Sequence, residues 1–198
     1  ADDRKLKQTE QARKITKVAA SLFAKKGYNG VGVAEIGAAS GFGRGTLYHH
    51  IESKEDLLHE IASQYISGLV QSGHKITKEY PDPIQRLSAL SRDLMAVISN
   101  SLAEIVVCFR EVQSLTGSRH HDVMCMHTEY QQIWSKTIEE GVQQNVFRAV
   151  DKIAVKGLLG MYFYSCLWLK PDGLQSPEDI GDVFSDLVIR SLSRSPNE

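Results

Sequence analysis

Hydrophobic residues return every three or four positions along most of the chain, which is the spacing of a helix with one buried face. In the first such segment Ile15, Leu22 and Phe23 belong to a stripe that stops at Gly27, so a helix is expected at about 10–26. Further helices are expected at about 33–40, 44–50, 53–73, 83–100, 103–115, 122–144, 153–169 and 177–191. The pattern predicts an all-α protein of about nine helices.

Capping residues mark several of the expected helix ends. Ser53 and Ser176 each stand where a hydroxyl can cap a following helix, and Asn145 can supply a left-handed exit from one. The polar stretches 74–80 and 116–120 are expected to be loops between helices. The helix at 153–169 is apolar nearly all round, so it is expected to be buried on both sides.

The stretch 33–54 has the spacing of two short helices that cross closely around a turn. Ile36 gives the first helix an inward face, and Gly37 leaves no side chain where the second helix must cross. Gly41 is suited to a left-handed stop, because glycine takes a positive φ at little steric cost. Leu47 can then pack beneath the crossing. This arrangement predicts a helix-turn-helix whose second helix enters a DNA major groove.

The packing of this second helix leaves five residues facing outward. They are Arg44, Gly45, Thr46, Tyr48 and His49. The Arg44 guanidinium, at the N-terminal end of the helix, can reach a guanine edge or a phosphate. Thr46 offers a hydroxyl and a methyl group to a base edge, and Gly45 permits close approach of the backbone. We therefore expect Arg44 and Thr46 to read bases.

The same stretch and its surroundings resemble the N-terminal signature of TetR-type bacterial transcriptional repressors. The match extends over about fifty residues with nearly every spacing kept, which makes it far more specific than one short motif. The matching positions are Gly27-Tyr28, Val33 to Ile36, Gly41, Gly45 to His50, Ser53-Lys54 and Leu57. The rest of the chain resembles that family in its helical plan.

The resemblance implies a homodimer that binds a palindromic double-stranded DNA operator and responds to a small-molecule effector. It also implies that Tyr48, His49 and Lys54 contact phosphates, with Lys54 placed at the N-terminus of the next helix. The chain departs from the family pattern at Gly32 and Gly43, where Ser or Thr usually caps the two short helices. Glycine is an adequate cap, but two hydroxyls that could have bound phosphate are absent.

Charge divides the chain into a basic head and an acidic body. Residues 4–54 hold ten Lys and Arg against three Glu, a net charge of +7, which leaves −8 for the remainder of a chain whose net charge is −1. A basic N-terminal part suits contact with DNA. We expect a DNA-binding helix-turn-helix domain of three helices at 1–52 and a helical effector-binding and dimerisation domain at 53–198.

Aromatic and methionine residues gather in the middle and late helices of the body, where they suit a flexible apolar pocket. The residues expected to line an effector pocket are Phe109, Met126, His127, Tyr130, Trp134, Tyr162 and Phe163. Any single one of these residues is better interpreted as an ordinary core residue. The prediction of a pocket depends on their clustering and on the family resemblance. The Phe147-Arg148 pair and the run from Trp168 to Gly173 are similar to the acyl-CoA-responsive branch of the family, so the expected effector is an acyl-CoA or another hydrophobic or amphipathic compound.

The last helix carries a long apolar stripe that suggests a subunit interface. The residues expected in this interface are Ile180, Val183, Phe184, Leu187 and Val188. In TetR-like proteins the last two helices pair with their symmetry mates in a four-helix bundle, and the resemblance implies the same arrangement here. A bound ligand would then change the distance between two DNA-binding heads, with release from DNA or tighter binding both open.

Other classes of function fit the sequence less well. His120, His121, Cys125 and His127 lie near one another, but an accidental cluster explains them better than a metal site. No catalytic motif occurs, so neither an enzyme nor a cofactor is expected. The three scattered cysteines indicate a reducing compartment, and no apolar run is long enough to span a membrane, so a cytoplasmic protein is expected. The main alternative is a helical carrier of lipids or small molecules, or an interaction module, that does not bind DNA.

Overall fold

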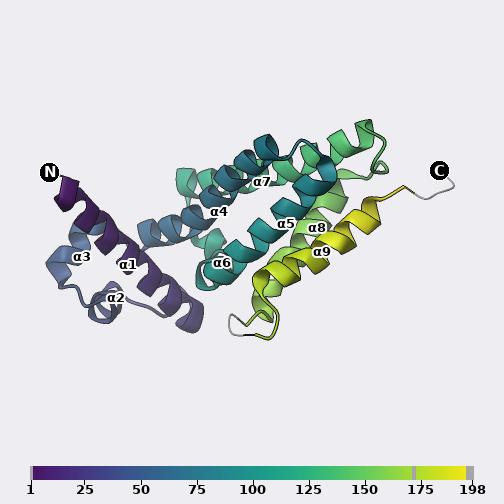
Figure 1. The fold of residues 1–198 in the computed structure, drawn as a ribbon. Coiled ribbons are helices and arrows are strands. Elements are labelled where there is room, and N and C mark those ends of the chain that lie inside the picture. The colour runs from purple at the N-terminus through teal and green to yellow at the C-terminus, as the bar shows by residue number, and fades with distance from the viewer. Residues whose placement is uncertain (1, 171–172, 195–198) are drawn as a thin grey trace. The chain divides into compact units, whose positions relative to one another are not determined.

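The protein is all-helical in the computed structural model, which describes residues 2–170 and 173–194; the side chains of residues 2–9 and of Arg44 lie outside this description (Figure 1). The described part contains nine α-helices and no strand. They are α1 (Asp2–Lys26), α2 (Val33–Ser40), α3 (Arg44–His50), α4 (Lys54–Glu79), α5 (Pro83–Asn100), α6 (Leu102–Glu111), α7 (Gly117–Gln143), α8 (Lys152–Tyr164) and α9 (Pro177–Leu192). Short 3₁₀ turns follow α6 at Val112–Ser114 and α8 at Ser165–Leu167. The all-α prediction is confirmed.

The chain divides into two compact units that do not follow the order of the sequence. The first unit contains the residues up to Tyr65 together with Ala103–Met124, and the second contains Ile66–Leu102 together with the residues from Cys125 on. Two long helices, α4 and α7, therefore each begin in the first unit and continue into the second. The expected boundary between a DNA-binding domain at 1–52 and an effector-binding and dimerisation domain at 53–198 therefore stays a prediction.

The head of the first unit is built around a close crossing of α2 and α3. A β-carbon on Gly37 would lie 3.3 Å from the Phe42 carbonyl oxygen and 3.5 Å from Leu47 Cδ2, so the crossing leaves little space there. Leu47 and Ile36 are completely or almost completely buried beneath it. Gly41 ends α2 with φ +76°, as expected of a glycine at this position.

The second unit is built on the packing of α5 against α9. A β-carbon on Gly181 would lie 2.9 Å from the Arg92 Cα atom, so the two backbones meet where α9 has no side chain. Ser185 donates a hydrogen bond of 2.9 Å to Ser88 across the same contact. The predicted cap of α9 is present, since Ser176 forms a capping box with Asp179 at the start of the helix. These polar and small residues fix the register of α9 on α5.

Several helix limits differ from the sequence prediction, and the reasons are local. The helix α4 runs through Gly73 to Glu79, because Gly73 packs against α7: a β-carbon there would lie 2.9 Å from Ile133 Cδ1. The stretch 74–80 is thus largely helical, and the chain leaves α4 only before Pro81. The helix α7 begins at Gly117, five residues earlier than expected, and α1 begins at Asp2. Asn145 has φ 59°, which confirms the predicted left-handed exit.

Candidate DNA-reading surface and effector cavity

The α3 helix presents its polar side outward while one buried leucine anchors it. Gly43 caps the helix without a side-chain hydrogen bond, as its missing hydroxyl requires. Leu47 is 1% exposed, whereas Gly45, Thr46 and His49 are exposed and Tyr48 is 48% exposed. No atom lies within 4 Å of a β-carbon built on Gly45. The predicted outward residues thus share one accessible surface, and their contacts with DNA stay a prediction. The predicted base-reading side chain of Arg44 lies outside the described part of the structure.

The structure gives Lys54 a role inside the head that the sequence did not reveal. Its Nζ atom donates hydrogen bonds to the carbonyl oxygens of Tyr28 at 2.9 Å and Val31 at 3.3 Å. The ammonium group also lies 4.2 Å from the centre of the Tyr28 ring, within the range of a cation–π contact. Lys54 thus fastens the turn before α2 to the start of α4, and one N–H group is left for a phosphate. In the sequence, the one indication of this contact was that Tyr28 and Lys54 both belong to the positions that match the family signature.

His50 differs from its neighbours on α3 because it faces the head. Its Nε2 atom lies 3.3 Å from Gln11 Oε1 on α1, and its ring is half-buried. His50 therefore packs within the head, in contrast to the exposed His49. The two histidines therefore have separate roles.

The C-terminal end of α6 is hydrogen-bonded to the head within the first unit. The Glu111 carboxylate accepts a hydrogen bond of 3.2 Å from the Tyr28 backbone N–H, and Arg110 donates one of 3.3 Å to the Ala24 carbonyl oxygen. Burial and the nearby carboxylates Glu55 and Glu111 raise the pKa of Tyr28 above its ordinary value. The head is thus attached to residues that lie more than eighty positions further along the chain.

A second group of bonds connects the start of α7 to the start of α4. Glu55 Oε1 accepts hydrogen bonds from the Thr116 N–H at 2.8 Å and the Thr116 hydroxyl at 2.9 Å. Arg119 forms an ion pair with Asp56, whose carboxylate also accepts a hydrogen bond from Ser53. These bonds hold the pKa values of Glu55 and Asp56 below their ordinary range. The first turns of α4 and α7 are therefore bound to each other, and α4 is bound to the head through Lys54.

The residues predicted for the effector pocket separate into core residues of the second unit and one outlier. The rings of Tyr130 and Trp134 lie 6.5 Å apart, and those of Trp134 and Tyr162 lie 5.3 Å apart. The rings of His127 and Phe163 lie 6.5 Å apart, and burial lowers the pKa of His127. All of these except His127 are at most 8% exposed. Met126 is half-buried, and Phe109 belongs to the first unit, where it is 57% exposed.

Two buried polar atoms among these aromatic residues interact only weakly, with each other. The Tyr130 hydroxyl and the Trp134 indole nitrogen are buried without a well-formed hydrogen bond. The Tyr162 hydroxyl, in contrast, lies 2.6 Å from the Ser91 hydroxyl. The aromatic group is thus closely packed core with unused hydrogen-bonding capacity, and its role in binding an effector stays a prediction.

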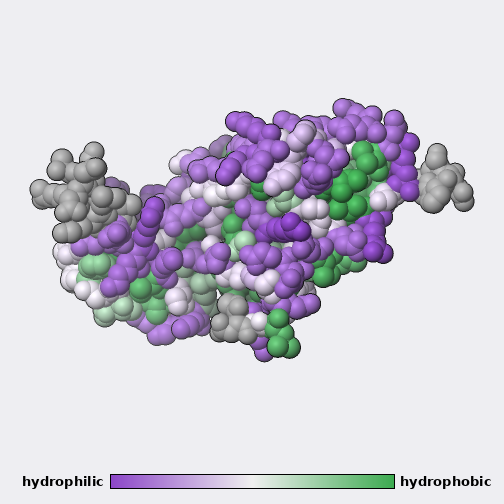
Figure 2. All heavy atoms as spheres, viewed as in Figure 1, coloured by the Kyte–Doolittle hydropathy of each residue, from purple (hydrophilic) through white to green (hydrophobic). Residues whose placement is uncertain are grey.

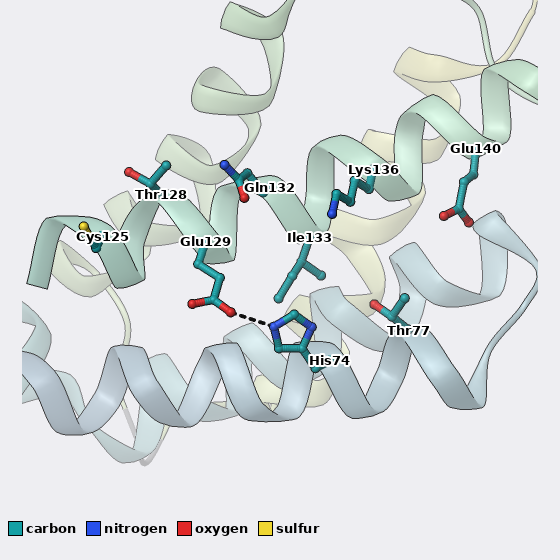
Figure 3. Close-up of a pocket in the computed structure, with 9 residues that line it drawn as sticks. All are labelled: His74, Thr77, Cys125, Thr128, Glu129, Gln132, Ile133, Lys136 and Glu140. Carbon is teal, nitrogen blue, oxygen red and sulfur yellow. Dashed lines mark hydrogen bonds and ion pairs between the residues drawn. The ribbon is translucent and has the colours of Figure 1, made fainter. Parts of the chain in front are cut away.

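A cavity of about 490 Å³ lies elsewhere in the second unit, between α4 and α7 (Figure 3). Its volume falls within the range of small-molecule sites, roughly 300–1,000 Å³. The lining residues are His74, Thr77, Cys125, Thr128, Glu129, Gln132, Ile133, Lys136 and Glu140. None of the predicted pocket residues is among them. The polar members on α7 recur at helical spacing, which is also the pattern of a solvated helix face, so no signal in the sequence distinguished them.

The charged groups around this cavity are unequally paired. His74 Nε2 lies 2.8 Å from Glu129 Oε1, which links α4 to α7. Glu140 is 2.6 Å from Nη1 of Arg86, a residue that is only 4% exposed and also donates to the Tyr80 carbonyl oxygen. Lys136 forms no ion pair or hydrogen bond in the described part of the chain. Lys136 is therefore the one charged residue of the lining that has no partner in the described chain, and its side chain is exposed.

The predicted interface residues on α9 point in two directions. Ile180 and Val188 are 6% and 1% exposed, so they pack within the protomer and are not available to a partner. The ring of Phe184 is half-buried, 5.2 Å from the Tyr162 ring. Only Val183 and Leu187, at 50% and 51%, are exposed, and Figure 2 shows hydrophobic surface beside α9. The apolar stripe of α9 thus includes residues of two surfaces, one packed within the protomer and one exposed.

Helix α8 and the turn that follows it supply exposed apolar residues that the prediction did not include. Ile153 is 71% exposed, Tyr164 64%, Leu167 63% and Trp168 47%. This helix is thus not buried on both sides within one protomer, contrary to expectation. Gly157 and Gly160 lie between these residues, and a β-carbon on either would meet no atom within 4 Å. The outer side of α8 is therefore apolar, and its two glycines have no side chains that would keep another helix at a distance.

Comparison with known families identifies the chain. Residues 15–61 match the model described as bacterial regulatory proteins of the tetR family, and residues 80–192 match a tetracyclin repressor-like C-terminal domain. The chain belongs to the TetR family. It is a ligand-responsive transcriptional regulator, and the alternative of a carrier without DNA binding is not favoured.

Individual relatives cover nearly the whole chain. The HTH-type transcriptional repressor KstR2 of Mycolicibacterium smegmatis is 26% identical over 188 residues, which cover 93% of this chain and 91% of the repressor. The crystal structure of PfmR from Thermus thermophilus, a TetR family regulator, is 30% identical with a TM-score of 0.83 and covers 91% of this chain and 99% of its own. AibR, whose crystal structure contains isovaleryl coenzyme A and operator DNA, is 27% identical with a TM-score of 0.77, covering 92% of this chain and 98% of its own.

Metal-binding groups and membrane spans are both absent from the described residues. These residues contain no group of three or more His, Cys, Asp or Glu side chains placed to hold a metal ion. No helix among them combines the length and the apolar character that a membrane span requires. His120, His121, Cys125 and His127 thus form no metal-binding group.

Proposed function

We propose that this TetR-family regulator is a repressor that binds a palindromic operator as a homodimer and leaves it when a hydrophobic or amphipathic small molecule binds the body. The exposed face of α3, anchored by the buried Leu47, is the observation that carries the proposal. In this proposal residues 1–52 bind DNA and residues 53–198 bind the effector and the partner. The regulator acts in the cytoplasm, where the operator is, and catalyses no reaction.

Selection from a pool of random DNA duplexes with the full chain tests operator binding. The enriched sequences are expected to be palindromes with half-sites about one helical turn, or ~34 Å, apart. The variant Gly45→Glu should bind none of them, because it adds a carboxylate to the DNA-facing side of α3 where a side chain meets no atom within 4 Å. Gly68→Glu is the matched control, since Gly68 is an exposed helical glycine of the second unit with equally open surroundings. Equal binding by both variants would contradict the proposal.

The outer sides of α8 and α9 support the dimer. Exposed apolar residues on both helices, with Gly157 and Gly160 between them, suit close packing against a second copy of the chain. Sedimentation velocity should show a dimer for the parent protein and a monomer for Leu187→Glu, which places a charge among these residues. Gly68→Glu should remain dimeric. A dimeric Leu187→Glu protein would move the interface away from this part of α9.

The nature of the effector is the third part of the proposal. AibR is a relative whose crystal structure contains isovaleryl coenzyme A, and the sequence similarity to the acyl-CoA-responsive branch points the same way. The residues of the second unit proposed to contact its apolar part remain Met126, His127, Tyr130, Trp134, Tyr162 and Phe163. Short-chain acyl-CoA compounds are expected to release the selected operator in an anisotropy assay. Tighter DNA binding in their presence would instead make the compound a corepressor.

A further inference from the structure

The cavity between α4 and α7 lies between the two helices that continue into the DNA-binding unit. His74 and Thr77 line it from the part of α4 beyond Tyr65, and all the other lining residues lie on α7 from Cys125 on. An occupant that changes the spacing of the two helices here acts on α4, whose first turn is bonded to the head through Lys54, and on α7, whose first turn is bonded to α4. Such a position suits a regulatory ligand, because coupling requires only different affinity for two arrangements of the helices.

The pairing of charges decides which kind of ligand the cavity favours. Glu129 is bonded to His74, and Glu140 is ion-paired with the buried Arg86, so both carboxylates of the cavity already have a partner. Lys136 has none in the described chain, and Figure 3 shows its side chain directed into the space between α4 and α7. The Gln132 amide adds a hydrogen-bond donor to the lining, whereas the Thr77 hydroxyl already donates to the Gly73 carbonyl oxygen. A cation with a neighbouring donor favours an anionic group.

We propose that this cavity binds the carboxylate or phosphate of a small organic effector, with Lys136 as the cation that pairs with it. The apolar side chain of Ile133, which also lines the cavity, lies beside an adjoining hydrocarbon part. The bound anion competes with Glu129 for His74 and so weakens the link between α4 and α7. This inference rests on the proposed function for its regulatory meaning, although the binding itself is independent of DNA.

Isothermal titration of the full chain without DNA tests the site. The probes are octanoate, which carries a carboxylate, and octyl phosphate, with octanol as the uncharged analogue. One probe molecule per protomer is expected for at least one of the two anions, and no binding for octanol. The anion that binds identifies which of the two groups the site accepts. Failure of both anions to bind at millimolar concentration would overturn the proposal, as would equal binding of octanol.

Paired lysine variants locate the cation. Lys136→Gln should weaken binding of the anionic probe by about tenfold or more, because it removes a charge-assisted hydrogen bond. Lys75→Gln removes the same charge from an exposed lysine of α4 that does not line the cavity, so its affinity should stay within about twofold of the parent. An unchanged affinity in Lys136→Gln, or equal losses in both variants, would overturn the role of Lys136.

Cysteine alkylation provides a second measure of where the probe binds. Cys125 lines the cavity and is exposed, whereas Cys166 lies on the turn after α8 and does not line it. A saturating anionic probe should slow alkylation of Cys125 by N-ethylmaleimide and leave the rate at Cys166 unchanged. Equal effects at both thiols would place the probe elsewhere. Operator binding is measured separately, so a protein that binds DNA but no anion would refute only this inference, and the reverse result would refute only the proposed function.

Discussion

The DNA-binding head and the helical body use their hydrophobic residues in opposite ways. In the head a few apolar side chains fill the whole core, with Leu47 under a glycine crossing, and the polar residues left outside form the candidate site. In the body the aromatic residues Tyr130, Trp134 and Tyr162 fill the core, whereas the cavity is lined mostly by polar residues. In the small core of the head, the hydrophobic pattern therefore also shows which residues form the functional surface. In the larger core of the body, it shows only which residues are packed inside.

Replacement of the single anchor of α3 should have the largest effect. Leu47→Ala removes an almost completely buried side chain, at a cost of about 2–5 kcal/mol in the free energy of unfolding of the head. Operator affinity should be lost with it, because α3 then has no fixed position. Thermal unfolding followed by circular dichroism and operator binding by fluorescence anisotropy measure the two effects.

The body provides the control for this comparison. If head and body are stabilised by separate cores, the Leu47→Ala protein should keep its dimeric state and the helical signal of α5, α8 and α9. Complete unfolding of the whole chain in one transition would show instead that the head determines the stability of the body. Retained operator affinity would show that α3 does not depend on Leu47.

The contrast also explains how much the sequence could predict. Gly37, Gly41 and Leu47 have spacings that few other structures require, so the helix-turn-helix and its outward residues followed from local geometry. The bonds of Lys54 to Tyr28 and Val31 join residues distant in sequence. So do the bonds between Glu111 and Tyr28 and between Thr116 and Glu55. No local pattern marks such contacts, because any exposed polar residue has the same periodicity.

The errors in the body have a related origin. Glycine often ends a helix, but Gly73 lies inside α4, where the lack of a side chain leaves space for Ile133. The apolar stripe of α9 includes Ile180 and Val188 facing the protomer and Leu187 facing outward, because hydrophobicity alone does not distinguish a core from an interface. Helix positions were therefore predictable, while the partner of each helix face was not.

Lys54→Ala should have the next largest effect on stability, and it tests whether the head is held by more than its apolar core. The loss of two charge-assisted hydrogen bonds and one ring contact should lower the stability of the head by about 1–2 kcal/mol. Lys26→Ala is the control, because it removes an equal charge from a largely exposed ion pair with Glu35 that contributes about 0–1 kcal/mol. Chemical denaturation compares the two variants, and equal losses would show that the bonds of Lys54 add nothing to the fold.

Arg44→Ala tests the outward face of the same head. We expect a loss of about 1–3 kcal/mol in discrimination at one base pair of each half-site, since a bidentate contact to guanine contributes that much. Lys54→Ala should instead weaken binding to all sequences and reduce the slope of affinity with salt concentration. Competition between the selected operator and its single-base variants separates the two results. A uniform loss in both variants would refute the division into base-reading and phosphate-binding residues.

The smallest expected effect concerns His127 in the body. Burial lowers the pKa of this imidazole below its ordinary value of 6.5, so the unfolded chain binds more protons than the folded one as the pH falls through that value. The associated stability is therefore present above about pH 6.5 and decreases as the solution becomes more acidic. His127→Gln, which is neutral at every pH, should flatten the dependence of the free energy of unfolding on pH between about 7 and 5. His121→Gln, at an exposed position of the same helix, should follow the parent curve. If His127→Gln also followed the parent curve, the ring would be reached by water in the folded protein, and the body would be less closed around its aromatic core than the head is around Leu47.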